Sequence, residues 1–221
     1  MKIGVFSHIN GNYSRLESIL GNMNRKKVDQ IYCLGNLIGN EAKKNGLSNN
    51  DCECAFLMKA YQYEFKTFYA LRGINEEEYL QNSEGNHNPR NNGIRYFIAG
   101  FHPNQFMIDN GFAYGFIFDG FGTKGRKESR KLINEKDSRF NYLLRDSKLF
   151  NRHTKILFLG DNQEQEAYVK EKNNINKKVF KSDDQMILPI NDPNFLGAVI
   201  SPSSKENGYM ILEKTSLEVY Q

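Results

Sequence analysis

Short apolar runs alternate with amphipathic segments in the first third of the chain. Three apolar runs are each closed by a polar turn: residues 2–6 (KIGVF), 30–34 (QIYCL) and 67–71 (TFYAL). Between them, residues 14–23 place apolar side chains three and four positions apart, and a second helical pattern starts at Asp51, a residue type that caps helices, and continues to residue 65. This β-α-β-α-β order predicts a mainly parallel sheet with helices on its faces.

The rest of the chain has a different pattern. Residues 94–99, 105–108 and 112–118 are β-rich runs separated by Gly, Pro and Asn, which predicts antiparallel strands. Residues 127–150 have a helical pattern, and several short strand-like runs follow from residue 155 onward. Because neither an internal repeat nor a Pro/Gly/Ser linker divides the chain, we expect a single domain over residues 1–221.

Composition excludes several classes of protein. The 221 residues are 39% hydrophobic and 13% aromatic, which is too apolar for a disordered chain. The apolar runs are too short for a membrane span or a signal peptide, so we expect a cytoplasmic protein without a membrane partner. The net charge of +4 is mild, and we interpret the basic clusters at 124–131 and 170–181 as solvated surface and expect no nucleic-acid partner.

The polar turns contain the residues with the most chemical interest. Each follows an apolar strand: Ser7-His8-Ile9-Asn10-Gly11-Asn12, Gly35-Asn36, Gly73-Ile74-Asn75-Glu76, Asp119-Gly120 and Gly160-Asp161-Asn162-Gln163. In an α/β sheet the carboxyl ends of parallel strands gather at one edge, and ligands bind there. The alternative is that Asn, Asp and Gly are present because they favour turns.

The order of these turns resembles that of the calcineurin-like metallophosphoesterases, in particular the small single-domain bacterial and archaeal phosphodiesterases. That branch also contains the retromer scaffold subunit. Six blocks carry the resemblance in the family's order: MKIGVFSHINGNYSRLESIL, QIYCLGNLIGN, FYALRGINEE, YGFIFDGFG, ILFLGDNQEQEAYV and AVISPSSKENGYMILE. The resemblance implies an α/β fold, namely a four-layer αββα sandwich of two facing sheets flanked by helices.

The resemblance also implies a site with two divalent metals, often manganese, that activate a water against a phosphoester. This chain departs from the family's residues at eight positions. His8 stands for an Asp, Asn10 for a His, Asn36 for the bridging Asp, Ile74 for an Asn, Asn75 for the catalytic His, and Asp119, Asp161 and Gln163 each for a His. A neutral Asn36 is a poor bridge between two cations, and the amide of Asn75 does not titrate as a general acid.

Two functional hypotheses follow from these departures. The first is a non-catalytic binding or scaffold protein without a cofactor, in which Asn10, Asn36, Asn75 and Gln163 line a pocket for a phosphate-bearing small ligand. We expect such a protein to act with a protein partner or as a homo-oligomer. The alternative is a divergent phosphoesterase, in which His8, Asp119 and Asp161 hold one divalent ion such as manganese, zinc or iron.

Overall fold

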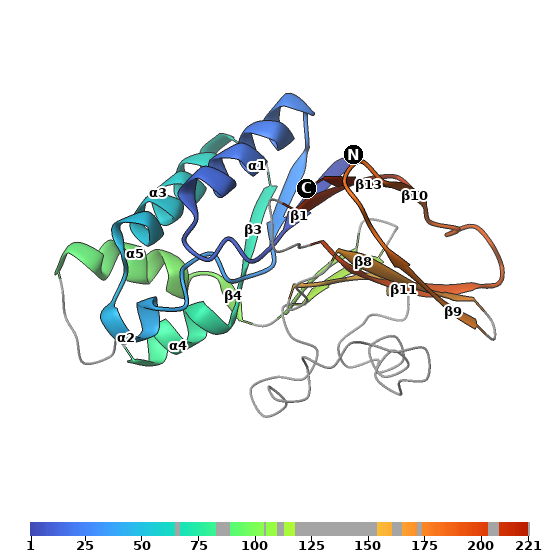
Figure 1. The fold of residues 1–221 in the computed structure, drawn as a ribbon. Helices are drawn as coiled ribbons and strands as arrows, with labels where there is room; N and C mark the ends of the chain where they lie inside the picture. The colour runs from blue at the N-terminus through green and yellow to red at the C-terminus, as the bar shows by residue number, and fades with distance from the viewer. Residues whose placement is uncertain are drawn as a thin grey trace.

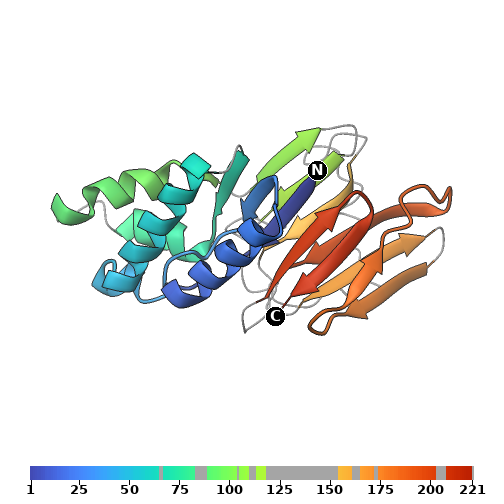
Figure 2. The same ribbon diagram turned by 90° about the horizontal axis from the view of Figure 1, so that it is seen from above.

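The structure, a computed structural model, describes residues 1–64, 67–82, 89–103, 105–109, 113–117, 154–160, 165–171, 174–202 and 208–220. Within them the chain forms an α/β fold with two mixed sheets, one of seven strands and one of six (Figure 1). Seen from above, the helices of the first hundred residues lie at one end of the molecule and the C-terminal strands at the other (Figure 2). The expected α/β class with two sheets is therefore confirmed.

The first sheet is parallel on one side and antiparallel on the other. Its strand order is β10 (Gln185–Ile187), β13 (Ser216–Tyr220), β12 (Tyr209–Glu213), β1 (Lys2–Phe6), β2 (Gln30–Cys33), β3 (Thr67–Arg72) and β4 (His102–Pro103). The strands β1 to β4 run parallel to one another, whereas β1 pairs with β12 in antiparallel register. The predicted parallel arrangement of the first three strands is thus confirmed.

The second sheet is assembled mainly from the C-terminal half. Its order is β5 (Gln105–Asp109), β6 (Ala113–Ile117), β7 (Thr154–Leu159), β11 (Phe195–Ser201), β8 (Glu166–Glu171) and β9 (Asn174–Val179). The strands β6, β7 and β11 are parallel, so the carboxyl ends of β7 and β11 lie at the same edge of this sheet. The edge strand β9 falls within the basic cluster 170–181.

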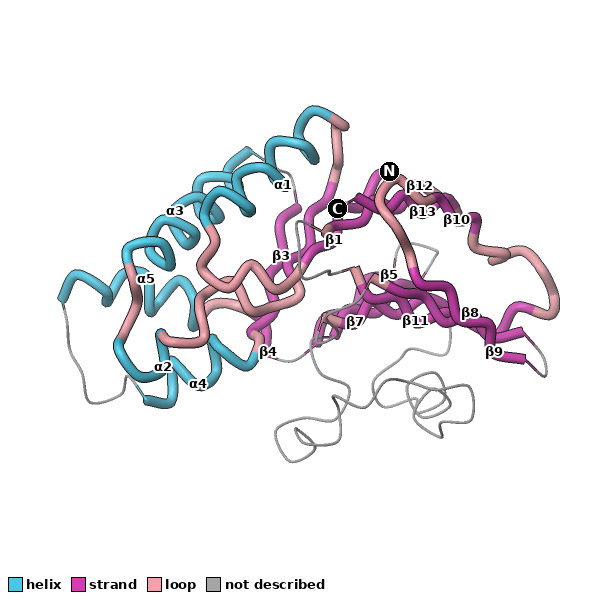
Figure 3. The backbone as a smooth tube through the Cα atoms, viewed as in Figure 1, coloured by secondary structure: helices cyan, strands magenta, loops and turns pink. Residues whose placement is uncertain are grey.

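Five described helices accompany the first sheet: α1 (Tyr13–Arg25), α2 (Ala42–Asn45), α3 (Asn49–Glu64), α4 (Ile74–Asn82) and α5 (Pro89–Ala99). They lie on the side of that sheet away from the second sheet (Figure 3). The predicted helix at 127–150, which would supply the fourth layer, and the basic cluster 124–131 lie outside the described residues. Among the described helices, none is both long and apolar enough to cross a membrane.

Two hydrophobic cores lie on opposite faces of the first sheet. In β1, Ile3 and Val5 belong to the core between the sheets, whereas Phe6 belongs to the core under the helices. In β2, Tyr32 belongs to the core between the sheets and Cys33 to the core under the helices. Strands that are buried on both faces need apolar residues at every position. This requirement explains the continuous apolar runs in the sequence.

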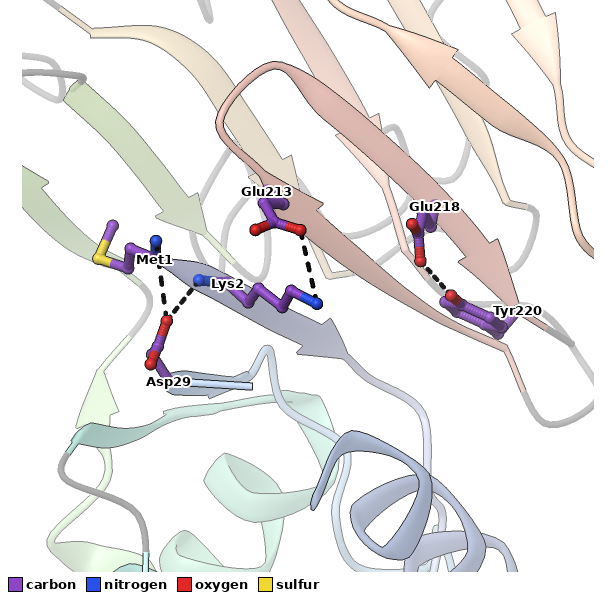
Figure 4. A network of polar contacts seen from close by, with 6 residues as sticks. All are labelled: Met1, Lys2, Asp29, Glu213, Glu218 and Tyr220. Atoms are coloured by element: carbon purple, nitrogen blue, oxygen red, sulfur yellow. Dashed lines mark hydrogen bonds and ion pairs between the residues drawn. The ribbon is translucent and has the colours of Figure 1, made fainter. Parts of the chain in front are cut away.

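The amino-terminal end of β1 is held by polar contacts (Figure 4). The backbone nitrogen of Lys2 donates to Asp29 Oδ2 at 2.7 Å, and Lys2 Nζ lies 3.5 Å from a carboxylate oxygen of Glu213 on the neighbouring strand. These side chains are partly or fully exposed, so the ion pair adds little stability. Nearby, Tyr220 donates a hydrogen bond to Glu218.

One predicted strand is wrong. Residues 94–99 belong to helix α5 rather than to a strand. Ile94 and Ile98, four positions apart, are both buried, while Tyr96 between them is exposed. A short apolar run does not by itself distinguish a strand from a buried helical turn, and here the spacing of four decides for the helix.

The start of α3 also differs from the prediction. The helix begins two residues before Asp51, and Ser48 is the capping residue. Ser48 Oγ accepts from the Asp51 backbone N–H at 3.1 Å, and the Asp51 carboxylate accepts from the Ser48 backbone N–H at 2.9 Å. This reciprocal pair is a capping box. The second carboxylate oxygen of Asp51 accepts from the Gly39 N–H at 2.6 Å, which ties the helix to the loop after β2.

Candidate functional site

The loops that follow β1 and β2 run side by side beyond the end of the sheet. The backbone N–H groups of His8, Asn10 and Gly11 donate to the carbonyl oxygens of Gly35, Asn36 and Leu37 at 3.1, 2.8 and 2.8 Å, respectively. The parallel pairing of the strands is thus continued by loop-to-loop hydrogen bonds. This arrangement brings together the first two of the predicted polar turns.

Left-handed backbone conformations shape these loops. His8, Asn10 and Asn36 have φ angles of 57°, 54° and 54°. Asparagine tolerates this region because its short polar side chain bonds locally, and histidine is also enriched there among residues other than glycine. The turn geometry therefore explains in part why these residue types are present.

Asn75 joins the third loop to the first two. Its side-chain Nδ2 donates to Asn10 Oδ1 at 3.2 Å and to the carbonyl oxygen of Ile38 at 2.8 Å. Its backbone N–H donates to Asn36 Oδ1 at 3.2 Å. The predicted ligand-binding residues Asn10, Asn36 and Asn75 are therefore brought into one hydrogen-bonded cluster, from two loops and the first turn of α4. Asn36 and Asn75 are buried, while Asn10 is exposed.

Glu76 stands in one of the predicted polar turns, but the sequence analysis assigned it no role. Its side chain is 0% exposed, and its carboxylate accepts from the backbone N–H groups of Gly73 (2.7 Å), Asn36 (2.8 Å) and Ile38 (3.0 Å). Burial raises the pKa of this carboxyl group, while the backbone N–H groups oppose that shift. The sequence contained a signal for this role. A Glu three residues after the capping residue of a helix commonly accepts from the backbone N–H of that capping residue.

Gly73 lies where the loop after β3 approaches the loop after β2. A Cβ atom at this position would collide with the backbone nitrogen and the side-chain oxygen of Asn36. Only glycine therefore permits this approach, which the bonds of Asn75 and Glu76 require.

His8 is held in one tautomer by its neighbour Ser7. Ser7 Oγ donates its proton to the carbonyl oxygen of Gly160, at the end of β7, at 3.0 Å. The 3.0 Å contact between Ser7 Oγ and His8 Nδ1 is then a bond that His8 donates, since the hydroxyl has only one proton. The neutral ring therefore carries its proton on Nδ1 and a lone pair on Nε2, the atom that a metal ion would use.

His8 is neutral at physiological pH. Burial, followed by the positive charge of Arg15, lowers its pKa from 6.5 to about 4. Arg15 is the second residue that the sequence analysis missed: it is 7% exposed, and its Nη1 donates to the His8 carbonyl oxygen at 2.9 Å. The sequence indicated that Arg15 is buried, because it lies four residues before Ile19 and therefore on the same, inner side of α1.

The remaining predicted site residues, Asp119, Asp161 and Gln163, lie outside the described residues. Among the described residues, no group of three or more His, Cys, Asp or Glu side chains is arranged to hold a metal ion. The role of His8, Asp119 and Asp161 as ligands of a single ion therefore stays a prediction.

Solved structures match this chain over its whole length. A metallophosphoesterase from Sphaerobacter thermophilus superposes with a TM-score of 0.66 at 16% identity, covering 100% of this chain and 87% of that one. The chain has the metallophosphoesterase fold. A protein from Thermus thermophilus matches with a TM-score of 0.50 at 12% identity, covering 99% and 97%. A novel archaeal phosphodiesterase has a TM-score of 0.49 at 12% identity, covering 99% and 98%.

The sequence itself matches no protein-family model and no curated protein. At these low identities the structural matches concern the fold alone, so the activity of this metallophosphoesterase-fold chain has to be argued from its own residues.

Replacement of Gly73 by alanine should destabilise the protein, because the added Cβ forces the loop after β3 away from Asn36 and loosens the bonds of Glu76. We expect a loss of about 2 kcal/mol or more in the free energy of unfolding, measured by urea denaturation. Gly93→Ala in α5 is the matched control, since a Cβ there meets nothing within 4 Å. It should leave stability unchanged or raise it by up to about 1 kcal/mol. Equal effects of the two variants would contradict the close approach at Gly73.

His8 should make stability depend on pH. Because its folded pKa of about 4 lies below the unfolded value of 6.5, the unfolded chain takes up the proton first, and stability is lost as the pH falls from 6.5 toward 4. At 1.36 kcal/mol per pKa unit, the loss is at most about 3 kcal/mol. His8→Asn keeps a residue that tolerates φ near 57° but removes the titration. Urea unfolding between pH 7 and pH 4 should give a flatter profile for the variant, and parallel profiles would contradict the assignment.

Proposed function

We propose that this chain is a non-catalytic member of the metallophosphoesterase fold that binds a phosphate-bearing ligand at its strand-end loops. The observation that carries the proposal is the setting of Asn75, the position where the resemblance places a catalytic histidine. Its side-chain N–H groups donate to Asn10 and Ile38, and its amide has no proton that titrates near neutral pH. Asn75 serves to hold loops together instead of transferring a proton.

The described residues do not fit a pair of divalent ions. Two adjacent cations need a bridging carboxylate, but the side-chain oxygen of Asn36 is neutral and already accepts from the Asn75 N–H. Two buried carboxylates lie nearby: that of Glu76 is enclosed by three backbone N–H groups, and that of Asp51 accepts from the N–H groups of Gly39 and Ser48. The guanidinium of Arg15 adds a positive charge beside His8, which disfavours a second cation.

The same features favour an anionic ligand. Arg15 supplies positive potential, and the amides of the strand-end loops offer both donors and acceptors to phosphate oxygens. Asn10 is the exposed member of the amide cluster; its Nδ2 donates one proton to the His8 carbonyl oxygen at 3.2 Å, and the second proton is the one assigned to a ligand. The proposal therefore assigns Asn10 to ligand contact, and Asn36 and Asn75 to holding the loops in place.

A second candidate function is favoured by one observation, the tautomer of His8. With the proton on Nδ1, the lone pair on Nε2 is of the kind that a transition-metal ion binds. In a single-metal phosphoesterase, His8 would hold the ion together with Asp119 and Asp161, and the ion would polarise the phosphoester and its attacking water.

Calorimetric titration distinguishes the two functions. Inorganic phosphate should bind to chelator-treated protein, and Asn10→Ala should weaken binding by about tenfold, the loss of one hydrogen bond to a charged group. Asn24→Ala, an exposed asparagine at the far end of α1, is the matched control and should bind as the wild type does. Absence of phosphate binding would overturn the proposed ligand class.

The catalytic alternative is tested in the same preparation. Manganese and zinc are titrated, and hydrolysis of bis(p-nitrophenyl) phosphate is followed with each ion present. We expect no hydrolysis above that of the ion alone. Stoichiometric metal binding with hydrolysis, both lost in Asp161→Ala, would replace the non-catalytic proposal by the single-metal phosphoesterase.

A further inference from the structure

Two buried asparagines at the strand ends have amide orientations that backbone groups fix. The side-chain oxygen of Asn36 accepts from the backbone N–H of Asn75 at 3.2 Å, and a backbone N–H can only donate. The side-chain nitrogen of Asn75 donates to the carbonyl oxygen of Ile38 at 2.8 Å, and a carbonyl oxygen can only accept. The nitrogen and oxygen ends of both amides are therefore determined. We call Asn36 and Asn75 the amide pair.

The amide pair has polar atoms that the loops do not use. Asn75 Nδ2 donates its two protons to Asn10 Oδ1 and to the Ile38 carbonyl oxygen, whereas Asn75 Oδ1 accepts from no donor within the described part of the chain. Asn36 Nδ2 likewise donates to no acceptor among the described residues. Both residues are only 5% exposed. Neither atom is one of the fully enclosed, unpartnered side-chain atoms of the described chain, so both are accessible to a ligand.

These two atoms are not explained by the support of the loops. A polar atom on a buried side chain normally has a hydrogen-bond partner, because leaving it without one costs stability. The support of the loops accounts for one end of each amide, namely Asn36 Oδ1 and Asn75 Nδ2. A bound group that accepts from Asn36 and donates to Asn75 would give the opposite ends their partners.

Asn10 adds a donor beside the amide pair. Its Nδ2 donates one proton to the His8 carbonyl oxygen and has a second proton for a ligand. The N–H groups of Asn36 and Asn10 match phosphate oxygens that carry no proton. The oxygen of Asn75 would repel such an oxygen, since both carry negative charge, and it matches a P–OH group instead.

The buried carboxylate of Glu76 favours the protonated form of a phosphate group as well. It accepts from the backbone N–H of Asn36 at 2.8 Å, so a negative charge lies next to the amide pair. A negative charge disfavours the ionisation of a neighbouring acid. A phosphate group bound at the amide pair is therefore expected to keep a proton.

We propose that the amide pair selects a phosphate group that carries a proton, namely hydrogen phosphate or the singly protonated form of a phosphomonoester. Asn36 and Asn10 donate to its unprotonated oxygens, and Asn75 Oδ1 accepts from its P–OH group. Sulfate and phosphodiesters, which carry no proton near neutral pH, are rejected. The inference rests on the proposed function, because it concerns the phosphate-bearing ligand of the same loops.

Calorimetric titration of the full chain at neutral pH compares inorganic phosphate with two anions of matched charge. Sulfate has the shape and charge of the hydrogen phosphate dianion, and dimethyl phosphate has the charge of the dihydrogen phosphate monoanion, but neither carries a proton. We expect phosphate to bind about tenfold or more tightly than either anion, which corresponds to one hydrogen bond that involves a charged group.

The N–H donors have their own test in Asn36→Asp. The aspartate keeps an oxygen for the Asn75 backbone N–H and tolerates the left-handed backbone at position 36, where φ is 54°. It replaces the N–H donors by a charged oxygen, so phosphate binding should weaken by about a hundredfold or more. Asn24→Asp adds the same charge at an exposed position of α1 and should bind phosphate as the wild type does. Thermal unfolding of each variant establishes that the fold is retained.

The possible failures separate the inference from the proposed function. A wild type that binds no phosphate would overturn the proposed function and this inference with it. A wild type that binds phosphate and sulfate equally well would retain the phosphate site but overturn the selection by Asn75 Oδ1. A selective wild type whose phosphate binding is unchanged in Asn36→Asp would overturn the assignment of the site to the amide pair.

Discussion

The carboxylate of Glu76 fixes the positions of two of the strand-end loops. It accepts hydrogen bonds from the N–H groups of Gly73, Asn36 and Ile38, so the loops after β2 and β3 share one acceptor. A buried N–H without an acceptor is costly, and so is a buried carboxylate without donors. Separating the loops would leave both the N–H groups and the carboxylate buried without hydrogen-bond partners. The approach of the two loops, the need for glycine at position 73 and the position of Asn75 all follow from this contact.

Contacts within the protein support the strand-end loops. Glu76, the loop-to-loop backbone bonds and the left-handed residues set the course of these loops. Two of the positions that depart from the resemblance take part in this support, since the Asn75 amide joins Asn10 to the carbonyl oxygen of Ile38. A shared fold at 16% identity leaves the chemistry of the strand ends to be argued from this chain's own residues.

The sequence predicted most of the parallel sheet because each strand is buried on both faces and reads as an uninterrupted apolar run. It did not predict α5, because the apolar run that contains Ile94 and Ile98 fits either a strand or a helix. The structure decides for a helix, since both residues are buried on the same side. Three members of the amide cluster were predicted by their place after strands. Glu76 and Arg15 were not, because their roles depend on burial, and a charged residue in sequence is read by default as exposed.

The charge of the site follows from the two residues that the sequence did not reveal. Without Arg15, a neutral His8 with a lone pair on Nε2 and a cluster of amide oxygens would favour a cation as readily as an anion. With the guanidinium at the His8 carbonyl, the charge beside His8 is positive, and the pKa of His8 is pushed further down, whereas the Asp51 carboxylate lies at the N–H of Gly39 in the loop after β2. The Glu76 carboxylate does not balance that charge at the surface, because its oxygens are directed at backbone N–H groups in the interior. Under the proposed function, the positive charge of Arg15 attracts a bound phosphate group, whereas it repels a divalent metal ion.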